Sequence, residues 1–159
     1  MRPHPTWLIA TWFGVGLAPL APGTAASLVA LPIAWGLITV SGSLGLALAT
    51  ALLFGLGVWA AGAYSAALGD ADPRTVVVDE VAGQWLAILP AAALSSPVLW
   101  HYALAFVLFR AADIGKPWPA GWIDRNLGGG MGIMLDDVAA GLYAALGLGL
   151  AIWVSDAVR

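Results

Sequence analysis

Two pairs of adjacent acids, Asp79-Glu80 and Asp136-Asp137, each lie at the start of an apolar run. Carboxylates in the first turn of a helix interact favourably with its dipole and accept hydrogen bonds from free N–H groups, so each pair could cap a helix. Carboxylates that lie together repel one another unless a cation or an arginine lies between them. Oxygen ligands with few imidazoles nearby suit Mg²⁺, which binds few carboxylates together with substrate phosphate. The pairs therefore indicate helix caps or a magnesium site.

Basic residues between the two pairs could bind an anion. Arg110 and Asp113 are three positions apart and share one face of a predicted helix. Either they neutralise each other, or Asp113 is a metal ligand and the planar guanidinium of Arg110 binds phosphate oxygens. Lys116 and Arg125 either contribute to the same phosphate site or anchor helix ends to anionic lipid headgroups.

Three further polar segments allow both a structural and a functional interpretation. Thr24 and Ser27 follow a Pro-Gly turn, where hydroxyls and free N–H groups could bind an anion, although Thr24 is expected more simply as a helix N-cap. We expect Asp124 in a polar turn with a local salt bridge. Asp70 and Asp72 are expected in a solvated loop.

Missing residue types restrict the mechanism. The chain has no cysteine, and its two histidines, His4 and His101, lie far apart, which argues against thiolate and paired-histidine phosphatases. No Asp-x-Asp pair follows a convincing strand, so an aspartyl-phosphate enzyme is not indicated. Phosphate chemistry would then need a metal-activated water, with basic residues stabilising the transferring group. The net charge of −3 says little on its own, but the lack of a basic patch or run argues against a nucleic-acid partner.

The composition is typical of an integral membrane protein. Hydrophobic residues make up 61% of the 159 residues and charged residues only 9%, with a mean hydropathy of +0.90. Soluble domains have roughly 25% charged residues. The alternative is a soluble all-α protein with buried core helices. The length predicts a single domain covering residues 1–159.

Turn signals divide the chain into about five main helices, preceded by a turn-rich N-terminal segment at 7–20. The predicted fold is therefore an all-α, multihelical integral membrane bundle. The predicted helices cover residues 25–40, 44–68, 79–94, 98–113 and 135–154. The breaks at 41–43 and 95–97 carry no charge. If both breaks are hairpins, the N-terminus and residues 69–74 and 110–137 share one side, which the positive-inside rule makes cytoplasmic.

The motifs resemble those of phosphatidylglycerophosphatase A, a family of bacterial lipid phosphatases. The most specific ones are the Lys-Pro-Trp-Pro segment at 116–119 and the Gly-Met-Gly-Ile-Met-Leu-Asp-Asp segment at 130–137. The resemblance covers nearly the whole chain in the same order. It rests on residues 22–24, Ser27, 72–73, 78–85, 109–119, 122–126 and 129–141.

The resemblance implies a Mg²⁺-dependent phosphomonoesterase that converts phosphatidylglycerophosphate to phosphatidylglycerol and phosphate. It also implies a multi-pass protein of a bacterial inner membrane with a cytoplasmic-facing site. The implied metal ligands are Asp79, Glu80, Asp113, Asp136 and Asp137, and the implied phosphate contacts are Arg110, Lys116 and Arg125. Asp79 or Glu80 is the first candidate to orient the attacking water.

Two rival functions stay open at this stage. A membrane phosphotransferase that moves an alcohol onto a nucleotide-activated lipid would also use acids and Mg²⁺, but its Asp-Gly-x-x-Ala-Arg pattern is missing. A non-enzymatic cation carrier would need acids in mid-span, whereas these acids lie at the ends of the apolar runs. The sequence also leaves open whether the protein forms a homodimer.

Overall fold

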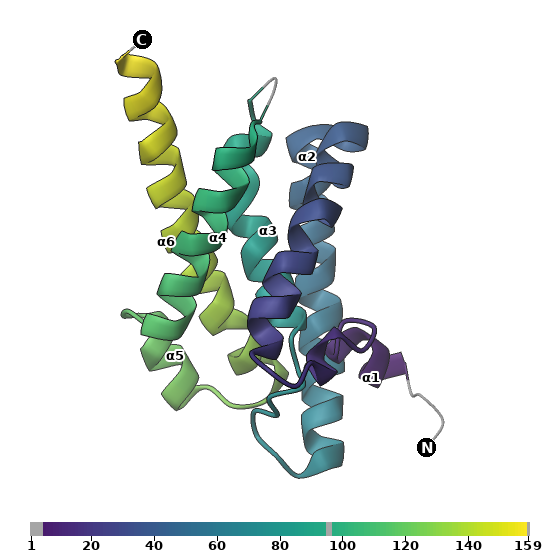
Figure 1. Cartoon of the computed structure of the whole chain (residues 1–159). Helices are drawn as coiled ribbons and strands as arrows, with labels where there is room; N and C mark the ends of the chain where they lie inside the picture. Colours follow the sequence, from purple (N-terminus) through teal and green to yellow (C-terminus); the bar gives the residue numbers. More distant parts are fainter. Residues whose placement is uncertain (1–4, 95–96, 159) are drawn as a thin grey trace.

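Six α-helices and one short 3₁₀-helix form the computed structural model, which describes residues 5–94 and 97–158. These two ranges contain no β-strand, so the predicted all-α fold is confirmed. The long helices run side by side, and the two short ones, α1 and α5, lie toward one end (Figure 1). The elements in chain order are α1 (Pro5–Ala10), η1 (Val15–Leu17), α2 (Pro22–Leu68), α3 (Val78–Ala92), α4 (Leu99–Gly115), α5 (Ala120–Asn126) and α6 (Gly129–Ala157).

The long helix α2 is a hairpin of two limbs. Gly42 has φ 66° and ψ −166°, a conformation that only glycine adopts at little steric cost. The first limb, residues 22–41, and the second limb, residues 43–68, therefore run in opposite directions (Figure 1). The break predicted at 41–43 is confirmed, and the two limbs with α3, α4 and α6 are the five main helices. The break predicted at 95–97 includes residues 95 and 96, which lie outside the described residues.

Two helices begin earlier than predicted. The N-cap of α2 is Ala21 and not Thr24, because Pro22 has a fixed φ that suits the first helical position. The last helix begins at Gly129 rather than at residue 135. A Cβ on Gly130 would overlap the backbone carbonyl oxygen of Val58 in the second limb of α2. Gly130 therefore allows the start of α6 to pack closely against the second limb of α2.

Glycines also set the contact between α3 and α6. A Cβ on Gly141 would lie 2.6 Å from the carbonyl oxygen of Gly83, and a Cβ on Gly83 would lie 2.8 Å from the carbonyl oxygen of Asp137. Small residues at such a crossing let two backbones approach closely. The approach places Asp137 of α6 beside the first turns of α3.

The N-terminal segment packs against the chain that leads into α3. The N–H of Val77 donates a hydrogen bond to the carbonyl oxygen of Ala10 at 2.8 Å. A Cβ on Gly16 would overlap the carbonyl oxygen of Thr75, so this turn fits only glycine. Val77 is fully buried. The segment thus supports the point at which α3 begins.

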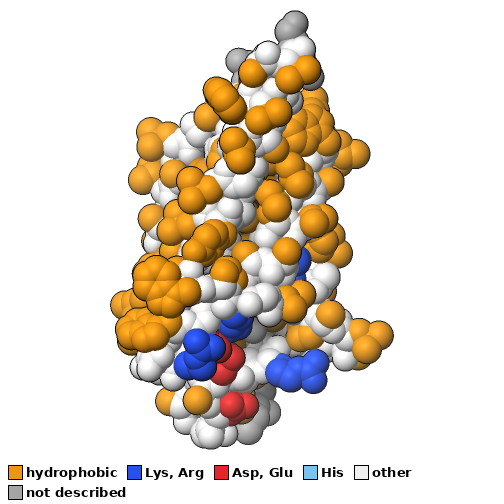
Figure 2. All heavy atoms as spheres, turned by 90° about the vertical axis from the view of Figure 1, so that its left-hand side faces the viewer, with side chains coloured by type: hydrophobic (Ala, Val, Ile, Leu, Met, Phe, Trp, Pro, Cys, Tyr) orange, Lys and Arg blue, Asp and Glu red, His pale blue; other side chains and the backbone are white. Residues whose placement is uncertain are grey.

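Two helices, α2 and α6, are long and apolar enough to cross a membrane by length and composition. The most apolar stretch of each is only 33% buried within the molecule. About two-thirds of the residues in each stretch are therefore partly or fully exposed, and Figure 2 shows hydrophobic side chains over much of one side of the bundle.

The α3–α6 crossing gives a stability prediction. Gly141→Ala should lower the free energy of unfolding by about 1–3 kcal/mol, because the added methyl group forces two backbones apart. The measurement is thermal or denaturant unfolding of the full chain in detergent. Gly149→Ala is the matched control on the same helix, since the nearest atom to its new Cβ is 3.8 Å away. Equal stability of the two variants would contradict the proposed packing constraint.

Candidate active site

A cavity of about 500 Å³ lies at one end of the bundle. It is bounded by the start of α2, the loop before α3, the first turn of α3, the end of α4, α5 and the start of α6. Among the described residues, every Asp, Glu, Lys and Arg except Asp70 and Asp156 lines it. Charged side chains gather at this end, and hydrophobic ones cover the rest of the visible face (Figure 2). The charged lining consists of Asp72, Arg74, Asp79, Glu80, Arg110, Asp113, Lys116, Asp124, Arg125, Asp136 and Asp137.

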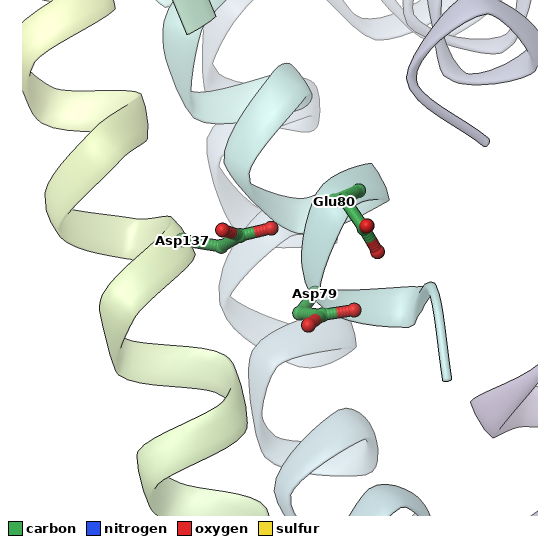
Figure 3. Close-up of side chains that lie close together, drawn as sticks. All are labelled: Asp79, Glu80 and Asp137. Atoms are coloured by element: carbon green, nitrogen blue, oxygen red, sulfur yellow. The ribbon is translucent and has the colours of Figure 1, made fainter. Parts of the chain in front are cut away.

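Three carboxylates converge on one wall of the cavity. One oxygen each of Asp79, Glu80 and Asp137, which we call the acidic triad, lie within 4.8 Å of one another. Asp79 and Glu80 come from the first turn of α3, and Asp137 reaches toward them from α6 (Figure 3). Asp79 Oδ1, Glu80 Oε2 and Asp137 Oδ2 are buried and have no hydrogen-bond partner.

These partnerless oxygens fit a divalent cation. Carboxylates so close together repel when ionised, and a buried ionised oxygen without a partner is costly. A cation bound between them would remove both costs. The donors are all oxygen, which suits Mg²⁺, Ca²⁺ or Mn²⁺ better than zinc or copper.

Local packing leaves room for the triad. A Cβ on Gly23, in the first turn of α2, would overlap the carboxylate of Glu80, so only glycine allows Glu80 this position. The Gly83–Gly141 contact fixes the separation between α3 and α6, and therefore between Asp79 and Asp137.

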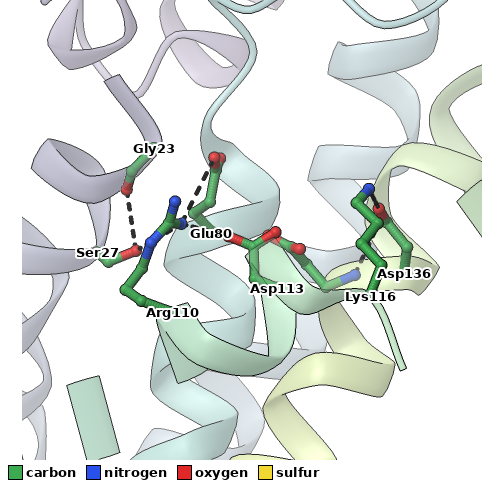
Figure 4. A network of polar contacts seen from close by, with 8 residues as sticks. Gly23, Ser27, Glu80, Arg110, Asp113, Lys116 and Asp136 are labelled. Atoms are coloured by element: carbon green, nitrogen blue, oxygen red, sulfur yellow. Dashed lines mark hydrogen bonds and ion pairs between the residues drawn. The ribbon is translucent and has the colours of Figure 1, made fainter. Parts of the chain in front are cut away.

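Arg110 joins three helices beside the triad (Figure 4). Its guanidinium forms an ion pair with Asp113 on α4 and lies 3.9 Å from a carboxylate oxygen of Glu80 on α3. Its Nη1 also donates a hydrogen bond of 3.5 Å to the hydroxyl of Ser27 on α2. The Ser27 hydroxyl in turn donates to the carbonyl oxygen of Gly23.

Arg110 and its partners form one ionic cluster, and Lys116 with its two carboxylate partners forms a second. Its ammonium group donates hydrogen bonds of 2.6 Å to Asp124 on α5 and to Asp136 on α6. Partial burial alone would lower the pKa of Lys116, but these two hydrogen bonds raise it above its ordinary value. Asp124 lies in α5 and pairs with a residue eight positions earlier, so the predicted polar turn with a local salt bridge is wrong. The Lys-Pro-Trp-Pro segment folds α5 back and so brings Asp124 to Lys116.

The structure separates the five predicted acidic ligands into two groups. Asp79, Glu80 and Asp137 form the triad, whereas Asp113 pairs with Arg110 and Asp136 pairs with Lys116. All five line the same cavity.

The predicted phosphate contacts also differ in their surroundings. Arg110, Lys116 and Arg125 line the cavity, but Thr24 does not, and the hydroxyl of Ser27 reaches the site only through Arg110. Within residues 5–94 and 97–158, Arg125 forms no ion pair.

Sequence reasoning missed Arg74. This exposed residue lines the cavity and, like Arg125, has no ion pair to a described carboxylate. Arg74 is the one basic residue between Arg2 and Arg110, and it lies just before the Asp79-Glu80 pair. Its position close to this acidic pair was the feature of the sequence that could have identified Arg74 as a site residue.

Known proteins match this chain over the residues that form the site. The profile of the family described as phosphatidylglycerophosphatase A matches residues 8–152. The phosphatidylglycerophosphatase A of Escherichia coli K12 is 39% identical over 142 residues, covering 89% of this chain and 80% of that protein. The Haemophilus influenzae protein of the same name is 38% identical over 144 residues, covering 90% and 86%.

A third relative carries a different name. A Bacteroides thetaiotaomicron protein with the provisional name phosphatidylinositol-3-phosphatase is 40% identical over 152 residues, covering 92% of this chain and 93% of that protein. No solved structure shows significant similarity to the chain. The family match spans the first turn of α2, the acidic triad and both ionic clusters. The chain therefore belongs to the phosphatidylglycerophosphatase A family of phosphoric monoester hydrolases.

Proposed function

We propose that this protein hydrolyses the terminal phosphate monoester of phosphatidylglycerophosphate in a Mg²⁺-dependent reaction, releasing phosphatidylglycerol and phosphate. The family supports the reaction class. The observation that carries the metal proposal is the acidic triad, whose three buried oxygens lack a partner in a cavity that also contains four basic residues.

In this proposal Asp79, Glu80 and Asp137 hold the cation. Bound there, Mg²⁺ would polarise the phosphoryl oxygens and favour ionisation of a bound water. Asp113 and Asp136 hold Arg110 and Lys116 in place within the same cavity. Asp79 or Glu80 orients the attacking water, which forms the new P–O bond as the ester P–O bond breaks. The released glycerol oxygen takes a proton.

The basic residues bind the phosphate. Arg110 and Lys116 already have carboxylate partners, so their positive charge is largely balanced before substrate binds. Arg125 and Arg74 have no such partner among the described residues, and both are exposed at the cavity lining. A phosphate monoester brings about two negative charges at neutral pH, which these two arginines would balance.

The proposed setting is a bacterial inner membrane. The apolar stretches of α2 and α6 are only one-third buried, whereas the core helix of a soluble protein is mostly buried. The cavity end carries Arg74, Arg110, Lys116 and Arg125, and the positive-inside rule makes that end cytoplasmic. The protein would then be multi-pass, with its site reached from the cytoplasm.

The first prediction concerns the triad. Asp79→Asn and Asp137→Asn should each lower the rate of phosphate release by at least about 100-fold, because each removes a charge from the metal site while keeping side-chain size. The measurement is release of inorganic phosphate from phosphatidylglycerophosphate in detergent micelles. Asp156→Asn, which changes an acid outside the cavity, should retain full activity. Full activity of both triad variants would refute the site.

The second prediction concerns the metal. Treatment with a chelator should abolish phosphate release, and added Mg²⁺ should restore it. Calorimetric titration with Mg²⁺ should detect binding to the wild type and much weaker binding to Asp137→Asn. Unchanged activity after exhaustive chelation would eliminate the Mg²⁺ requirement and leave the phosphatase assignment intact.

The third prediction concerns Arg125. Arg125→Ala should raise KM by about 10- to 100-fold, the effect expected from losing one charge-assisted hydrogen bond of about 1.5–3 kcal/mol. Arg125→Lys should give an intermediate KM, because it keeps the charge but not the planar fork. If KM stayed at the wild-type value in both variants, Arg125 would serve only as a membrane anchor.

The same phosphate-release assay distinguishes between two candidate lipid substrates. Phosphatidylglycerophosphate and phosphatidylinositol 3-phosphate both present a phosphate monoester on a lipid headgroup. We expect the glycerophosphate lipid to be hydrolysed with the higher kcat/KM, and a reversed preference would move the assignment toward the name of the Bacteroides relative.

A further inference from the structure

One side of the cavity is lined by α2 and α4, which are joined by the hydrogen bond from Arg110 to Ser27. The first turn of α2 and the end of α4 approach each other where Arg110 lies beside Gly23. Arg110 Nη1 lies 3.3 Å from the position of a Cβ on Gly23 and 3.5 Å from the hydroxyl of Ser27. Gly23, Arg110 and Asp113 all line the cavity (Figure 4).

Two large, exposed apolar side chains are next in sequence to residues that line the cavity. Leu20 is 84% exposed and immediately precedes Ala21, which lines the cavity. Ile114 is 72% exposed and immediately follows the cavity residue Asp113. We call Leu20 and Ile114 the apolar rim. An apolar side chain left in water forgoes the stabilisation of burial, which contact with hydrocarbon would restore.

Charged and polar residues lie at another part of the cavity edge. The exposed lining residues on that edge include Asp72, Arg74, Arg125 and Asn126. Exposed apolar side chains and exposed charged side chains therefore both border the cavity. A ligand that suits both carries an anionic headgroup and hydrocarbon chains.

We propose that the apolar rim is the side entrance of the site, where Leu20 and Ile114 contact the acyl chains of the lipid substrate while its phosphate lies in the cavity. This inference rests on the proposed function and extends it to the position of the chains. The charged cavity lining would be a costly environment for acyl chains, so they stay outside it. The water-exposed edge at Arg74 and Arg125 is then where free phosphate leaves.

The test uses a double variant and two substrates. Leu20→Ser with Ile114→Ser should raise KM for dioleoyl phosphatidylglycerophosphate by about tenfold, because both acyl contacts lose apolar area. The kcat should be unchanged, since neither residue lines the cavity. KM for a water-soluble dihexanoyl analogue should stay within about twofold of wild type, because its short chains depend less on the rim.

A matched control separates the rim from general membrane contact. Leu146 on α6 is 73% exposed, as much as Ile114, and lies away from the cavity. Leu146→Ser should leave both KM values unchanged. The proposed entrance is wrong if Leu146→Ser raises KM as much as the double variant does. It is also wrong if the double variant raises KM equally for both substrates, or does not raise KM for the dioleoyl lipid. If the wild type hydrolyses neither lipid, the proposed phosphatase function is wrong. That result differs from one in which the wild type is active and only the proposed entrance is contradicted.

Discussion

Mutual repulsion among three buried carboxylates is the constraint on which the rest of this structure depends. Asp79, Glu80 and Asp137 place oxygens within 4.8 Å of one another in a bundle that is otherwise mostly apolar. Such an arrangement is stable only where positive charge lies nearby or a carboxyl group takes up a proton. The surrounding ion pairs of Arg110 and Lys116 neutralise the neighbouring acids but leave one oxygen of each triad member without a partner. The proposed divalent cation would supply the missing positive charge.

Glycine provides the geometry that this electrostatic arrangement needs. Gly23 makes room for the Glu80 carboxylate, and the Gly83–Gly141 contact brings α6 against α3. A larger residue at Gly83 or Gly141 would push α3 and α6 apart, and one at Gly23 would displace the Glu80 carboxylate. The same small residues reduce the apolar area that each helix can bury in its neighbours. The bundle therefore presents much apolar surface outward, in keeping with a lipid environment.

The sequence predicted the helices and the charged end well, because both follow from local patterns. Uncharged breaks, apolar runs and the clustering of acids are visible without tertiary information. It did not predict the pairing of Asp124 with Lys116 or the cavity position of Arg74, because both depend on how loops fold back. The early start of α6 was missed because glycine disfavours a helix interior, so the sequence predicted a helix only for the apolar run at 135–154. The close approach of the Val58 carbonyl oxygen to Gly130, which requires glycine there, depends on tertiary packing.

The triad is divided between the middle and the last helix of the chain, and this has a consequence for biosynthesis. A nascent chain that ends before α6 contains Asp79 and Glu80, with Arg110 as a nearby countercharge once α4 has been made. The third carboxylate arrives only with the final helix. The cluster of like charge is thus completed only after α3 and α4 have been made, and a chain that ends before α6 lacks the third acid of the proposed metal site.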